Sequence, residues 1–140
     1  FASAVKDFPI ELMHTAVPNL DHTAWDLVYH VHAAQRDILD YLRGGESYES
    51  PPYPGGFWPR GEEKSAGIDD WENTASSYFK DQDELRKMVE DQDADLFAPL
   101  FPGTGHTLLR EILVLADHTS YHVGQIVDVR MLLGAPVRDY

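Results

Sequence analysis

Two histidines near the C-terminal end of the chain have the spacing of metal ligands. His118 and His122 are four residues apart in the segment DHTSYHVGQ. On a helix this spacing places both imidazoles on one face, one turn apart, so both can reach the same cation. The glutamate that zinc proteases carry after the first histidine is Thr119 here, which excludes that class. Paired histidines also occur as hydrogen-bonded core residues, so a metal site requires a third ligand from another helix.

The third ligand is predicted to be His30. It shares a helical face with Leu27, Ala34 and Ile38, and the small side chain of Ala34 leaves room for an ion. His32 lies on a different, more mixed face, and we interpret it as a surface or interfacial histidine. The remaining histidines are interpreted as loop or cap residues: His14, His22 and His106.

Polar residues close to these histidines are candidates for orienting the imidazole rings. Asp37, Asp117 and Gln125 lie within one or two turns of the predicted ligands and could accept their N–H groups. Each of the three, taken alone, is better explained as a solvated residue on a helix face. Gly124 is predicted to let a neighbouring helix pack closely.

Three helices must position these residues. The apolar period predicts a helix over 24–43, capped by Thr23 and ended by two glycines. A second helix is predicted over 70–91, with Asp69 or Asp70 as its cap. The longest is predicted over 106–133, and it is stopped by Gly134 and Pro136: HTLLREILVLADHTSYHVGQIVDVRMLLG. Residues 1–8 are expected to be the last turns of a first helix, truncated at its N-terminal end.

The segment 44–69 is predicted to be a long crossover loop, because its prolines and glycines are incompatible with a helix interior. Four aromatic residues suggest that the loop packs onto the body of the protein: Tyr48, Tyr53, Phe57 and Trp58. Its length allows the helices on either side to run parallel. The prediction is one all-α domain over 1–140, a four-helix bundle with up-down-down-up topology.

The composition excludes several classes of function. With 24 acidic and 11 basic residues, the net charge of −13 opposes binding to nucleic acid or to anionic membranes. No run approaches the roughly 18 apolar residues of a spanning helix. The absence of cysteine excludes disulfides, thiolate metal sites and a cysteine nucleophile. No signal-peptide pattern is present, and a cytoplasmic location is expected.

Several segments resemble the DinB/YfiT-like family, also called the DinB superfamily. The last helix resembles the final helix of these proteins, with its DH-x-x-YH-x-GQ-I pattern, and Trp25 precedes His30 by five residues as in the family. The segments YPGGFWP and DADLFAPLFPGTGHTLLRE resemble one branch, so the likeness covers about 20–134. Departures are Tyr29, where glutamate is frequent, and Thr119-Ser120, where Asn-Ala is common.

The resemblance implies a four-helix bundle that forms a homodimer and holds a divalent metal ion on His30, His118 and His122. Nickel, zinc and iron all accept imidazole ligands, and the residues do not distinguish them. Some relatives are transferases or isomerases that use a low-molecular-weight thiol.

Two hypotheses about function follow. One is a metal-dependent transferase or hydrolase with an open coordination position and a small-molecule substrate. The alternative is a non-catalytic metal-binding structural or interaction protein of the stress-response type, in which the ion ties two helices together. The aromatic loop from Tyr48 to Trp58 either shapes a substrate pocket or closes the end of the bundle.

Overall fold

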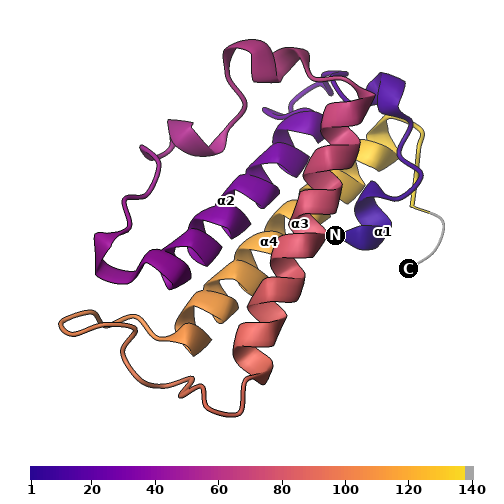
Figure 1. The fold of residues 1–140 in the computed structure, drawn as a ribbon. Helices are drawn as coiled ribbons and strands as arrows, with labels where there is room; N and C mark the ends of the chain where they lie inside the picture. The colour runs from indigo at the N-terminus through magenta and orange to yellow at the C-terminus, as the bar shows by residue number, and fades with distance from the viewer. Residues whose placement is uncertain (138–140) are drawn as a thin grey trace.

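Helices dominate the structure, a computed structural model that describes residues 1–137. A short helix, α1 (Ala2–Val5), precedes three long ones, α2 (Ala24–Gly44), α3 (Ile68–Glu90) and α4 (Leu108–Leu132). The described part of the chain contains no β-strand, which confirms the predicted all-α class. Figure 1 shows that α2 and α3 run in the same direction and α4 in the opposite one. Because α1 is a single turn, the direction of the first helix in the up-down-down-up order stays a prediction.

The helix ends follow local capping chemistry. The Thr23 hydroxyl accepts from the Asp26 backbone N–H, and the Asp26 carboxylate accepts from the Thr23 backbone N–H, so α2 begins where predicted. Helix α3 begins at Ile68, two residues earlier than predicted. The prediction of Asp69 or Asp70 as the cap residue was wrong, because Gly67 is the cap and Asp70 accepts its N–H from inside the first turn.

Helix α4 is slightly shorter than predicted at both ends. It begins at Leu108, because the Thr107 hydroxyl accepts the Arg110 N–H and thereby caps the helix. It ends at Leu132. Gly134 follows with a φ of 74°, a left-handed conformation that favours glycine, and this confirms its predicted role as the stop.

Helix α2 is the centre of the bundle. It packs against both α3 and α4, and its fully buried side chains include Leu27, Val28, Val31 and Leu39. Towards the N-terminal end of α2, Leu27 and Val28 join a core with Trp71 of α3 and with Ile126 and Val129 of α4. The same packing of α2 onto α4 brings the predicted metal ligands to one place. The described residues contain no helix that is both long and apolar enough to span a membrane.

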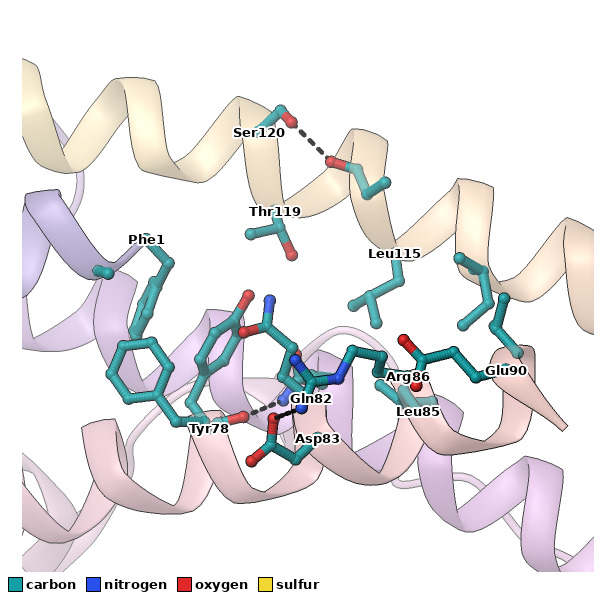
Figure 2. Close-up of a pocket in the computed structure, with 16 residues that line it drawn as sticks. Phe1, Tyr78, Gln82, Asp83, Leu85, Arg86, Glu90, Leu115, Thr119 and Ser120 are labelled. Atoms are coloured by element: carbon teal, nitrogen blue, oxygen red, sulfur yellow. Dashed lines mark hydrogen bonds and ion pairs between the residues drawn. The ribbon is translucent and has the colours of Figure 1, made fainter. Parts of the chain in front are cut away.

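A groove of about 690 Å³ lies between helices α3 and α4. Figure 2 shows Leu115 and Thr119 of α4 facing Tyr78 and Gln82 of α3 across it, with Phe1 at one end. Gly124, on the exposed side of α4, would have no atom within 4 Å of an added Cβ. The prediction that Gly124 permits close packing of a neighbouring helix was therefore wrong for the helices of this chain.

Buried polar side chains fix how the elements meet. Arg130 of α4 donates hydrogen bonds to the backbone carbonyls of Ala4 and Lys6, at 2.9 and 2.7 Å, and so holds the N-terminal segment against the bundle. Between α2 and α3, the buried carboxylate of Asp81 lies 3.3 Å from both His32 and Arg36. His32 is thus an interfacial histidine, as interpreted from the sequence.

The crossover segment spans residues 45–67 and contains three short 3-10 turns: η2 (Gly45–Ser47), η3 (Gly55–Phe57) and η4 (Gly61–Ser65). It is fastened to α2 by side chains, since Tyr48 donates to Asp37 at 2.8 Å and Trp25 donates to the Glu63 carbonyl at 2.7 Å. The expectation that its aromatic residues pack onto the body was wrong for Tyr53, which is 89% exposed. The same expectation was right for Trp58, which stacks on a side chain of α2.

Candidate metal centre

The structure brings His30, His118 and His122 together. The Nε2 atom of His30 lies 3.1 Å from the Nε2 atoms of both His118 and His122. One ligand nitrogen from each ring falls within 4.8 Å of the others. His30 and His122 are buried, and His118 is partly exposed. We call these three residues the histidine cluster.

Helix geometry explains the convergence. His118 and His122 lie one turn apart on the face of α4 that also buries Leu115 and Ile126, and this face is turned towards α2. His30 projects from the facing side of α2. The remaining histidines lie outside the cluster, although His22, interpreted as a loop residue, lies near it.

Hydrogen bonds at the far side of two rings fix their tautomers. The Nδ1 atom of His30 lies 3.0 Å from the Phe57 carbonyl oxygen, which can only accept, so Nδ1 carries the proton. The Nδ1 atom of His122 donates to the Gln125 side-chain oxygen at 2.7 Å. A neutral imidazole protonated on Nδ1 presents a lone pair on Nε2. Both rings therefore direct lone pairs into the centre of the cluster.

Of the three residues predicted to orient the rings, only Gln125 does so. Asp37 accepts hydrogen bonds from Tyr48 and Ser50 of the crossover segment instead. Asp117 acts on His118 only through its charge, which favours the protonated ring. The Nδ1 atom of His118 is buried and has no hydrogen-bond partner within residues 1–137.

Trp58 covers the cluster from the crossover segment. Its ring stacks on His30 with centroids 3.9 Å apart and planes 1° from parallel, and His22 also stacks on it at 3.9 Å. The sequence predicted that Trp58 packs onto the body but not that it touches a candidate ligand. No periodic pattern relates a loop residue to a helix face, so sequence reasoning had no signal for this contact.

The environment keeps the three imidazoles neutral. Burial, together with the neighbouring histidines, lowers the pKa of His30 from 6.5 to about 4, against the opposing effect of the Phe57 carbonyl. Burial also lowers the pKa of His118 and of His122. Neutral rings are the form in which histidine binds a metal ion.

The metal-free protein is expected to lose stability as the pH falls below 6.5. In the unfolded chain His30 titrates near 6.5, whereas in the folded protein its pKa is about 4, so the unfolded state binds more protons between these values. The contribution of neutral His30 to the free energy of unfolding is fully present above pH 6.5 and is lost as the pH falls towards 4. Urea denaturation of chelator-treated protein across this range measures the effect. In His30→Gln the loss should be smaller, and equal losses in both proteins would contradict the prediction.

Comparison with known families agrees with the resemblance seen in the sequence. A family model described as DinB superfamily matches residues 1–126, a range that contains all three histidines. Neither the curated proteins nor the solved structures contain a match to the chain.

Proposed function

Since the chain belongs to the DinB superfamily, we propose that it binds one divalent metal ion through His30, His118 and His122 and is a metal-dependent transferase or hydrolase. The convergence of the three Nε2 atoms carries this proposal. Two lone pairs that face each other at 3.1 Å, with the ring protons held elsewhere, repel unless a proton or a cation lies between them. Nitrogens at this separation can each lie about 2.0–2.1 Å from a shared cation.

An open coordination sphere supports the catalytic form of the proposal. Within the described residues the group of potential ligands contains the three histidines and no carboxylate. Catalytic sites characteristically keep three protein ligands and leave a position for water or substrate, whereas structural sites are closed. When bound, a divalent cation supplies Lewis acidity and lowers the pKa of a coordinated water or thiol. Because the chain has no cysteine, any thiol must come from a small molecule.

Residues around the histidine cluster hold the ligand rings in place for the ion. Gln125 and the Phe57 carbonyl hold two of the imidazoles in the tautomer that binds a metal, and Trp58 shields one face of His30 from water. The homodimer implied by the family remains part of the proposal. Large apolar side chains exposed on α4 support it: Leu113, Val114, Met131 and Leu132.

The alternative function, a structural metal site, rests on the position of the cluster. His30 belongs to α2 and the other two ligands belong to α4, so an ion would tie these helices together. Turnover separates the two functions. If the metal-loaded protein transfers a small thiol to an electrophile, or hydrolyses the electrophile, it is an enzyme. Stoichiometric metal binding without turnover of any thiol and electrophile tested supports the structural role.

Metal binding should be visible in the fluorescence of Trp58. We expect chelator-treated protein to bind Ni²⁺ or Co²⁺ at one ion per chain, with quenching of tryptophan emission because Trp58 stacks 3.9 Å from a ligand ring. Titration with fluorescence detection, together with elemental analysis, gives the affinity and the stoichiometry. Trp58→Phe should lose most of the quenching and about tenfold in affinity, the scale expected for loss of a group that orients a ligand.

A second tryptophan provides the control for this titration. Trp71 stacks on Phe8, away from the cluster, so Trp71→Phe should retain the metal-dependent quenching. Undiminished quenching in Trp58→Phe would contradict the placement of the ion beside Trp58. Absence of stoichiometric binding in the parent protein would overturn the proposed function itself.

A further inference from the structure

A small cavity lies beside the histidine cluster. It has a volume of about 290 Å³, and its wall includes the ligand His122. Other polar residues of the wall are Asn19, Asp21, His22, Tyr121, Gln125 and Asp128. A space of this size suits a small molecule.

The cavity adjoins the cluster along two paths. His122 forms part of the wall directly, and its ring is held there by Gln125, which also lines the cavity. His22 forms the wall on the other side and stacks on Trp58, which in turn stacks on His30. A molecule in the cavity therefore contacts one ring of the histidine cluster, that of His122, and is separated from His30 by His22 and Trp58.

The wall of the cavity is acidic. The wall contains two carboxylates, Asp21 and Asp128, and neither lysine nor arginine. Within residues 1–137 neither carboxylate forms a hydrogen bond or an ion pair. Some other acidic residues on the helices form ion pairs, since Asp40 pairs with Arg36 and Asp83 pairs with Arg86. The two carboxylates of the cavity are thus available to a cationic ligand.

We propose that this cavity binds the substrate and selects small molecules that carry a protonated amine beside a group able to bind the metal. The inference rests on the proposed function, because the metal ion would anchor the other end of the molecule. Asp21 and Asp128 attract the ammonium group and repel anionic analogues of the same size. The Tyr121 hydroxyl and the Gln125 amide supply further hydrogen-bonding groups in the same wall.

The effect on selectivity should be moderate, because both carboxylates are partly solvated. An exposed ion pair contributes little, so each carboxylate should favour a cationic over a neutral ligand by about threefold and the pair by about tenfold. Salt should reduce the preference, since exposed charges are screened.

The experiment uses Co²⁺-loaded protein and three thiols of similar size. Cysteamine is cationic, 2-mercaptoethanol is neutral and 3-mercaptopropionate is anionic, and each gives a cobalt–thiolate absorption band when it binds. The ratio of the cysteamine affinity to the 2-mercaptoethanol affinity is measured in the parent protein and in variants. Comparing the ratio between proteins cancels the different acidities of the thiols.

We expect the ratio to fall about threefold in Asp21→Asn or Asp128→Asn, and about tenfold in the double variant. The 3-mercaptopropionate affinity should rise in the same variants. The matched control is the double variant Asp69→Asn with Glu72→Gln, which removes two exposed carboxylates of α3 away from the cavity. In that control the ratio should stay at the parent value.

The outcomes separate this inference from the proposed function. Equal ratios in the parent protein and in the cavity variants would overturn the inference while leaving the metal site intact. An equal fall in the α3 control would overturn it as well, because the effect would then come from net charge. Failure of the parent protein to bind Co²⁺ would overturn the proposed function, and the inference with it.

Discussion

Replacement of His118 by alanine is expected to weaken metal binding by at least about 100-fold. Loss of a group that merely orients a ligand costs 10- to 100-fold in affinity, and loss of a ligand removes a coordination bond outright. His118 is the most informative of the three histidines to replace. It is partly exposed and its Nδ1 atom has no hydrogen-bond partner within residues 1–137, so the fold depends on it least.

Metal-dependent thermal stabilisation measures this loss. With the ion at about 100 times its dissociation constant, binding stabilises the folded protein by about 2.7 kcal/mol, and the stabilisation should disappear in His118→Ala at the same concentration. His14→Ala is the control, because His14 bonds to the Ala66 carbonyl outside the cluster. Any turnover found in the parent protein should disappear together with the bound metal. Unchanged affinity in His118→Ala would remove this residue from the ligand set.

The second large effect is expected from Arg130→Ala, which should lower the free energy of unfolding by about 3 to 5 kcal/mol. Arg130 is 4% exposed and its guanidinium donates to the carbonyls of Ala4, Lys6 and Ala135. Hydrogen bonds to charged groups contribute about 1.5–3 kcal/mol each, and acceptors left unpaired in the interior add a cost. Burial lowers the pKa of Arg130, against the opposing charge of Asp7.

Urea denaturation with matched m-values tests this expectation. Arg86→Ala is the control, because Arg86 is exposed and pairs with Asp83 at the surface, where a salt bridge contributes up to about 1 kcal/mol. Hydrogen exchange should also show lost protection in residues 1–8 of Arg130→Ala. A change no larger than that of Arg86→Ala would show that the N-terminal segment is held by its apolar contacts instead.

The helices and the histidine cluster were predictable because each depends on a regular period. His118 and His122 are related by one helical turn, and His30 was selected by the apolar face that it shares with Leu27. The cap at Thr23 and the stop at Gly134 were also predictable, because each depends only on residues close to it in the sequence.

Contacts made by loops were not predictable in the same way. Trp58 stacks on His30, and Arg130 reaches the carbonyl of Ala4 across 126 residues of chain. Neither contact follows from a period, because the path of a loop is set by the packing of the whole bundle. The start of α3 was misplaced for a smaller reason: an aspartate can cap a helix from before its first turn or from inside it.

The central position of α2 has a consequence for how the protein folds. Helical bundles usually fold rapidly because most of their contacts are local in sequence. Here the contacts of α2 reach far along the chain: Gln35 bonds to Tyr78, 43 residues away, and His30 meets His118, 88 residues away. During synthesis on the ribosome, the part of the apolar surface of α2 that packs on α4 therefore stays uncovered until α4 has emerged. Completion of the bundle should then be a late event that follows synthesis of α4, rather than a stepwise addition of finished helices.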